Sequence, residues 1–112
     1  MQDLQVIDNT EIVVESNINA DLFNSWIAYI DASQKTVETY TRNIRQFVYY
    51  LEDRGITMPT RADIVAYKEY LLETKKPTTV QGYLMAVKQF FKWAEQEHLY
   101  PNIADKVKAP KL

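Results

Sequence analysis

The apolar residues between Pro77 and Leu99 recur with the spacing of one helix face. They fall three or four positions apart, at Val80, Tyr83, Leu84, Val87, Phe90, Phe91 and Ala94. This spacing predicts an amphipathic helix over residues 77–99, and Thr78 followed by Gln81 has the form of a capping box at its start. Pro77 suits the first turn, where N–H groups have no helical partner. The opposite stripe, with Lys88 and Lys92, is polar and positive.

The same pattern occurs once before in the chain. When residues 36–56 are placed on residues 79–99, an offset of 43, the identical pairs are Thr36/Thr79, Val37/Val80, Tyr40/Tyr83, Gln46/Gln89, Phe47/Phe90 and Glu52/Glu95. Ile44/Val87 and Arg45/Lys88 are conservative pairs in the same register. One amphipathic helix therefore occurs twice, and the two copies are expected to form the scaffold of the fold.

Capping residues and apolar spacing predict three further helices. In chain order, the expected helices are 20–31, about 34–54, 61–74, 77–99 and a short one at 103–107. Their predicted N-caps include Asn19, Ser33, Thr60 with Asp63, and Asn102, while Gly55 is expected to end the second helix. The core of the third is expected to contain Ile64, Leu71 and either Tyr67 or Val65. Short connections and the lack of a convincing strand pair predict an all-α bundle. The pattern leaves the crossing angles open.

Composition limits the possible functions of the chain. Its 112 residues are enough for one domain. It has no cysteine, which excludes disulfides and thiolate metal sites and suits a cytoplasmic location. Because no long uncharged apolar run is present, we expect a soluble protein without a membrane partner. The single histidine, His98, lacks a His or Cys partner and is expected near a helix end, where the dipole favours it.

The distribution of charge is more informative than its total. The net charge of the whole chain is −2. Residues 1–31 contain six acidic residues and no basic one, whereas residues 32–112 contain all 13 lysines and arginines and have a net charge of +4. We expect residues 1–18 to be a mobile acidic tail with at most one short strand. The positive charge is concentrated in the helical part, where a nucleic-acid surface would need it.

The sequence shows no arrangement typical of an active site. There is no glycine-rich phosphate loop, no nucleophile elbow and no His-Glu-x-x-His pattern, and the carboxylates are spread over separate helices. We therefore predict no catalytic residue, no cofactor and no metal in this chain.

Small polar side chains at the start of both long helices, followed by basic residues, suit contact with a phosphate backbone. The candidate DNA-binding residues are Lys35, Thr36, Thr39, Arg42, Asn43, Arg45, Thr78, Thr79, Gln81, Lys88 and Lys92. Helix chemistry alone favours a plainer interpretation, in which these residues are ordinary caps and solvated charges. A helical protein–protein interaction domain without a DNA role therefore remains an alternative.

Four stretches occur in a familiar order. They are S-x-K-T-V-x-x-Y-x-x-x-I-x-x-F at 33–47, A-D-I-x-x-Y at 62–67, T-T-V-x-x-Y-L-x-A-V-K-Q-F-F-K-W-A at 78–94 and N-I-A-x-x-V-K-A-P-K-L at 102–112. Together they resemble the N-terminal, core-binding (SAM-like) domain of the phage integrase or tyrosine recombinase family, over about residues 20–112. Ile103 departs from the pattern, because the family usually has proline there.

The resemblance implies four main helices in two crossing hairpins, with a short fifth helix, forming half of a C-shaped clamp around double-stranded DNA. The second and fourth helices would face the DNA. The positions carried over from the family are Lys35, Thr36, Thr39, Arg42, Thr78, Thr79, Gln81 and Lys88. Asn43, Arg45 and Lys92 are added because of their expected place on the same helices.

The family's catalytic arginine, His-x-x-Arg pair and tyrosine nucleophile belong to a separate C-terminal domain, and none can be placed in this sequence. The resemblance therefore implies a DNA-binding domain at 19–108 that is not itself an enzyme. Residues 109–112 would begin a linker to the catalytic domain of the same polypeptide. The other implied partners are recombinase protomers bound to the same DNA, and the implied source is a bacterium, a phage or another mobile element.

Overall fold

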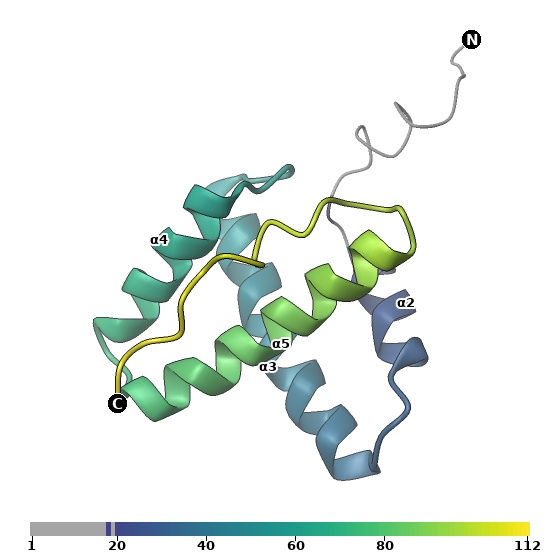
Figure 1. Ribbon diagram of the computed structural model, residues 1–112, viewed down its shortest axis with the longest axis horizontal. Coiled ribbons are helices and arrows are strands. Elements are labelled where there is room, and N and C mark those ends of the chain that lie inside the picture. The colour runs from purple at the N-terminus through teal and green to yellow at the C-terminus, as the bar shows by residue number, and fades with distance from the viewer. Residues whose placement is uncertain (1–17, 19) are drawn as a thin grey trace, which may run out of the picture.

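The computed structural model describes residue 18 and residues 20–112. Its helices are α2 (Ala20–Tyr29), α3 (Gln34–Arg54), α4 (Arg61–Leu72) and α5 (Pro77–Gln96). Figure 1 shows α5 crossing α3, with α2 and α4 on opposite sides of the crossing. No strand occurs in this part of the chain, so the all-α prediction is confirmed. The predicted cap Asn19 and residues 1–17 of the predicted tail lie outside the described residues.

Three predicted helix boundaries are confirmed by their hydrogen bonds. The Ser33 hydroxyl oxygen accepts the backbone N–H of Thr36 at 3.2 Å and begins α3. Gly55 ends α3 with a φ of 67°, a left-handed conformation that costs glycine little. At the start of α4, the backbone N–H of Thr60 donates to Asp63 Oδ2 at 2.7 Å. Local sequence therefore specifies where α3 begins and ends and where α4 begins.

The predicted capping box at the start of α5 is wrong. The helix begins at Pro77 with Lys76 as its N-cap and has no side-chain cap. Gln81 does not reach back to the helix start, because its amide nitrogen donates to the carbonyl oxygen of Pro110 at 3.4 Å. Proline at the first helical position supplies the required φ, so the helix starts one residue before the expected cap.

Several predicted helices are longer than the observed ones. Helix α5 stops at Gln96 instead of Leu99, because exposed His98 turns left-handed with a φ of 59° and the Leu99 N–H returns to the Ala94 carbonyl oxygen at 2.8 Å. The α2 helix ends at Tyr29, two residues early, and α4 ends at Leu72. These are last-turn differences, where helices fray and capping geometry decides the end.

The predicted fifth helix at 103–107 is not formed. Residues 103–106 make a turn, in which the Val107 N–H donates to the Ala104 carbonyl oxygen at 3.2 Å. Asn102 is accordingly not a helix cap. One short turn of helix gains too few hydrogen bonds to offset its nucleation cost. Burial of Ala104 and Val107, at 0% and 3% exposed, holds the segment instead.

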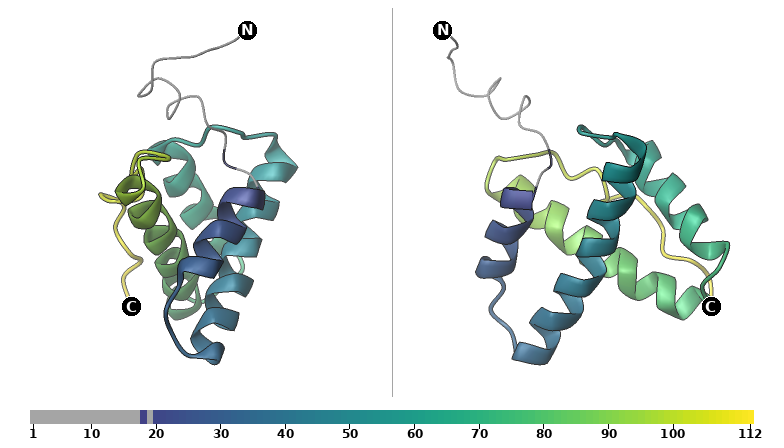
Figure 2. Two further views of the ribbon diagram at one scale, coloured as in Figure 1. Left: turned by 90° about the vertical axis from the view of Figure 1, so that its right-hand side faces the viewer. Right: turned by 180° about the vertical axis from the view of Figure 1, so that it is seen from behind.

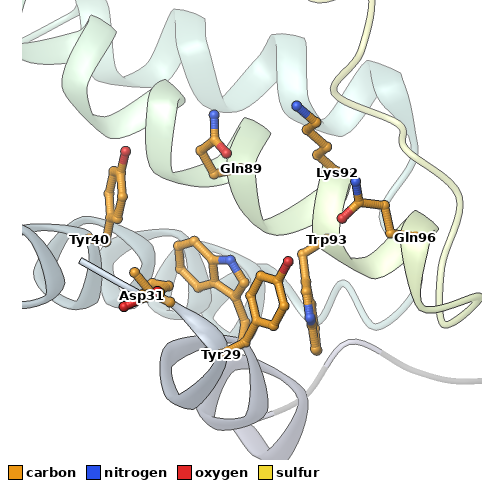
Figure 3. A pocket seen from close by; sticks show the side chains of 9 residues that line it. Tyr29, Asp31, Tyr40, Gln89, Lys92, Trp93 and Gln96 are labelled. Carbon is orange, nitrogen blue, oxygen red and sulfur yellow. The ribbon is translucent and has the colours of Figure 1, made fainter.

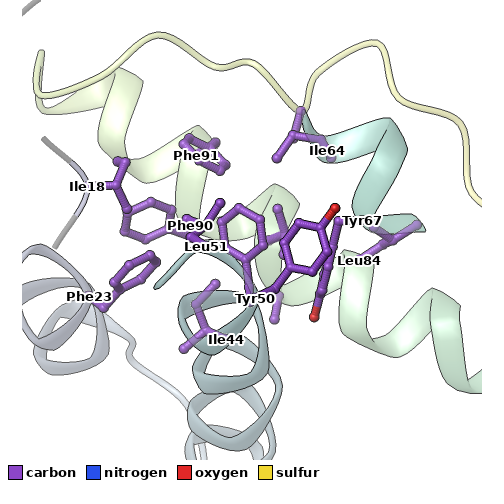
Figure 4. Close-up of a cluster of buried hydrophobic side chains, with 14 of the residues drawn as sticks. Ile18, Phe23, Ile44, Tyr50, Leu51, Ile64, Tyr67, Leu84, Phe90 and Phe91 are labelled. Carbon is purple, nitrogen blue, oxygen red and sulfur yellow. The ribbon is translucent and has the colours of Figure 1, made fainter. Parts of the chain in front are cut away.

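The core forms where the two long helices cross (Figure 4). Phe47 and Phe90, which are equivalent in the internal repeat, are both 0% exposed. The Phe23 ring of α2 stacks on Phe90 with centroids 4.4 Å apart. On the α4 side, the ring centroids of Phe47 and Tyr67 lie 5.1 Å apart. Tyr67 is buried while Val65 is 39% exposed, which decides between the two candidates for this position.

The C-terminal segment, residues 97–112, runs back along the helices (Figures 1 and 2). After α5 it passes beside the loop before α4, where the Tyr100 hydroxyl donates to the Pro59 carbonyl oxygen at 2.8 Å. It then runs back between α4 and α5 and ends beside the start of α5 (Figures 1 and 2). Burial of Val107 and Pro110 holds it in this position. Among the described residues, no helix is long and apolar enough to cross a membrane.

Candidate nucleic-acid interface

The crossing of α3 and α5 is joined by a polar contact. Asn43 is 5% exposed, and its amide nitrogen donates to the Gly82 carbonyl oxygen at 3.3 Å. A Cβ on Gly82 would lie 3.8 Å from that nitrogen, an ordinary contact, so close approach does not strictly require glycine. Asn43 was a candidate DNA contact, but the structure turns its side chain inward. Its amide is well placed to fix the relative position of the two helices.

From this crossing, the N-terminal halves of α3 and α5 diverge with no other described helix between them (Figures 1 and 2). The candidates whose side chains are exposed on these two helices are Lys35, Arg42, Arg45, Thr78, Thr79 and Lys92. Thr36 and Thr39 are half-exposed. The structure thus leaves most of the candidate polar residues open to a partner, along two helices that share one crossing point.

Two of the arginines of α3, Arg42 and Arg45, are free to bind an external anion. Arg42 and Arg45 line a shallow groove of about 460 Å³ together with Glu38, Gln46 and Tyr49. Within the described part of the chain, neither guanidinium has an ion-pair partner. A guanidinium can bind phosphate through two parallel N–H groups, so this face of α3 is suited to a phosphate backbone.

Hydroxyl groups at the start of α3 are partly engaged within the chain. The Ser33 hydroxyl donates to Thr36 Oγ1 at 3.0 Å while its oxygen caps the helix. Thr36 therefore supports the cap, as the plain interpretation expects, and Lys35 beside it is exposed. The helix N-terminus remains electropositive, but its nearest hydroxyls already have partners.

Two candidates on α5 contact the protein's own C-terminal segment. Lys88 Nζ donates to the Val107 carbonyl oxygen, and Gln81 holds the Pro110 carbonyl oxygen. A third side chain, Lys68 on α4, donates to the Lys108 carbonyl oxygen at 3.0 Å. The predicted DNA face of α5 is thus divided, with Thr78, Thr79 and Lys92 exposed and Gln81 and Lys88 engaged.

Lys92 lies at a groove that the sequence did not predict (Figure 3). Its volume is about 260 Å³, and it is lined by Trp26, Tyr29, Ile30, Asp31, Tyr40, Gln89, Lys92, Trp93 and Gln96. Gln89, Lys92 and Gln96 project from one side of α5, one turn apart. Tyr29 is 58% exposed, and its ring lies 6.0 Å from that of Trp93. The two glutamines could have been found from their three- and four-residue spacing to Lys92.

The described residues hold no arrangement for metal binding. No group of three or more His, Cys, Asp or Glu side chains in this part of the chain could hold a metal ion.

Comparison with known proteins places this fold in a family. Residues 22–100 match the family model described as phage integrase, N-terminal SAM-like domain. The chain belongs to this family. It is also 34% identical over 91 residues to Tyrosine recombinase XerC 2 of Ralstonia nicotianae, covering 71% of this chain and 26% of that protein. The chain thus corresponds to about a quarter of that relative's length. No solved structure gives a significant match.

The match to the integrase SAM-like domain includes α3, α4 and α5 completely and begins within α2. It therefore contains the crossing, the exposed arginines and the groove at Lys92. The match ends at Tyr100, before the segment that contacts Gln81 and Lys88.

Proposed function

We propose that this chain is the DNA-binding, core-binding domain of a site-specific tyrosine recombinase. It would grip double-stranded DNA for integration or recombination carried out by a separate catalytic domain of the same polypeptide. The main support is the set of exposed basic residues on the two crossing helices, Lys35, Arg42 and Arg45 on α3 and Lys92 on α5, none of which has an ion-pair partner within the described residues. Membership of the integrase family supports the same proposal.

The residues of the proposed interface fall into basic, neutral and structural groups with different roles. Lys35, Arg42, Arg45 and Lys92 supply positive charge for the phosphate backbone. The neutral donors Thr39, Thr78 and Thr79 lie on the same helices and are suited to fixing register or contacting base edges. Asn43 acts indirectly, by holding the two helices at their crossing.

Duplex binding by the full chain tests the proposal directly. With about 3–5 phosphate contacts, log K should fall with log salt at a slope of roughly −3 to −4.5, and binding should be weak. Fluorescence anisotropy with a labelled 25-base-pair duplex of random sequence, measured between low and moderate salt, gives the slope. Affinity that does not change with salt would contradict the proposal, because phosphate contacts release counterions.

The chain by itself is expected neither to cleave nor to rejoin DNA. Within the part of the chain that the structure describes, His98 is exposed beyond the end of α5, and no hydrogen bond joins it to a tyrosine or an arginine that could form a nucleophile with it. The measurement is denaturing gel electrophoresis after incubation with a nicked suicide duplex, which traps a covalent tyrosine–phosphate link. A protein–DNA adduct that survives denaturation would show that this prediction is wrong.

A protein-interaction role has support from a different surface. Tyr49 and Tyr70 are 54% and 46% exposed and line one groove of about 460 Å³ between α3 and α4. Arg54 lies over the rings of Tyr50 and Tyr70, at 3.9 and 4.8 Å from their centroids. Tyrosine and arginine are common in the centres of protein interfaces. We propose other recombinase protomers on the same DNA as the partner class for this surface.

A further inference from the structure

The C-terminal segment engages Gln81 and Lys88, two of the DNA contacts that the sequence predicts on α5. Three side chains from two helices each hold one of its carbonyl groups: Lys88 holds that of Val107, Lys68 that of Lys108 and Gln81 that of Pro110. Val107 is only 3% exposed, so the segment is packed as well as hydrogen-bonded. These contacts join residues 19 to 40 positions apart in the chain. The position of the segment is therefore fixed by tertiary contacts and not by its local sequence.

Engagement by the segment and contact with DNA compete for the same donors. The Lys88 ammonium and the Gln81 amide cannot donate to the segment and present the same hydrogens to a phosphate. A phosphate oxygen carries negative charge and binds an ammonium more strongly than a neutral carbonyl does. DNA phosphates can therefore replace the segment as acceptors for these donors. Part of the free energy of DNA binding is then spent on displacing the segment.

We infer that residues 107–110 form an autoinhibitory cover over the DNA face, which duplex DNA displaces when it binds. This inference rests on the proposed function and adds a means of regulating the same site. Only the molecules whose segment is displaced can use these donors to bind DNA. The apparent dissociation constant is therefore the intrinsic one divided by the fraction of molecules in that open state. By linkage, DNA must loosen the segment by the same factor.

Lys68 allows the inference to be tested without altering the proposed DNA contacts. It lies on α4, outside the interface, and its contact with the segment is the hydrogen bond to Lys108. Removing its charge should weaken DNA binding if electrostatics alone decides the outcome. Removing its hydrogen bond should release the cover and strengthen binding. The two effects have opposite signs.

We expect Lys68→Gln to tighten binding to a 25-base-pair duplex by about three- to tenfold, since it removes one charged hydrogen bond from the seated state. The matched control is Arg61→Gln, which removes one exposed charge from the same helix and is not one of the side chains that hydrogen-bond to residues 107–110. That control should bind equally or more weakly. Anisotropy titrations at one salt concentration compare both variants with the unchanged chain.

A second variant keeps every charge. Pro110→Gly removes the buried ring next to Gln81 and should also tighten binding. In the unchanged chain, NMR should show the backbone shifts of residues 107–111 moving toward random-coil values as duplex DNA is added. If neither variant binds more tightly than the unchanged chain, or these shifts keep their folded values in saturating DNA, the cover is not inhibitory and the inference is overturned. Failure of the unchanged chain to bind any duplex would instead overturn the proposed function.

Discussion

Replacing Phe90 by alanine should lower the free energy of unfolding by about 3–5 kcal/mol, the usual cost of removing a buried phenylalanine. Phe90 is 0% exposed and lies at the centre of an aromatic cluster. Its ring centroid is 4.4 Å from that of Phe23, 4.9 Å from that of Phe91 and 5.8 Å from that of Trp26. The substitution therefore leaves a cavity between α2 and α5 that rigid aromatic rings cannot fill.

The loss is large compared with the stability of a domain of this size, which is generally about 5–15 kcal/mol. Urea denaturation followed by circular dichroism measures it. Gln89→Ala is the matched control, because it changes the neighbouring, exposed residue of the same helix and should alter stability by less than about 0.5 kcal/mol. DNA affinity of Phe90→Ala should fall only in proportion to the unfolded fraction. A loss below about 1 kcal/mol would contradict this account of the core.

The parts of the fold that the sequence predicts correctly are those set by local chemistry or by the repeat. Ser33 and Gly55 fix the ends of α3 through contacts with residues at most four positions away. The repeat places Phe47 and Phe90 on equivalent faces, and both are fully buried. Periodicity and capping are sufficient for such features, because each depends on neighbours in the sequence.

The features that the sequence misses depend on contacts between distant segments. Asn43 has the appearance of a surface residue on an amphipathic helix, but the crossing with Gly82, 39 positions away, buries it. The pairing of Gln81 with Pro110 likewise depends on where the C-terminal segment runs. The same packing favours a turn over a helix at residues 103–106. Local patterns carry no information on these contacts.

The candidate site shows the same division. Both long helices are correctly identified as carriers of exposed polar residues, and Lys35, Arg42, Arg45 and Lys92 are exposed on them. The roles of Thr36, Asn43 and Lys88 within the fold could not be predicted, since each is decided by a hydrogen-bond partner inside the molecule. Whether the exposed residues contact DNA remains a prediction.

Replacing Arg42 and Lys92 together by alanine is expected to have the largest effect on DNA binding. Both residues are exposed, lie on the two crossing helices and have no ion-pair partner within the described residues. Each lost phosphate contact should flatten the salt slope by about 0.9, which corresponds to roughly an eightfold loss of affinity at 0.1 M salt. The double variant should therefore bind about 60-fold more weakly, on all sequences alike.

The matched control is the double variant Arg61→Ala with Lys106→Ala, which removes the same charge from exposed positions outside the proposed interface. It should change the slope much less, because general electrostatic attraction releases fewer counterions than direct contact. Thr79→Ala provides a contrast, since a neutral donor affects register or base preference more than the slope. If the Arg42/Lys92 variant stays folded and binds duplex DNA as tightly as the unchanged chain, these side chains are only solvated charges. The protein-interaction surface at Tyr49 and Tyr70 would then become the better account of the domain.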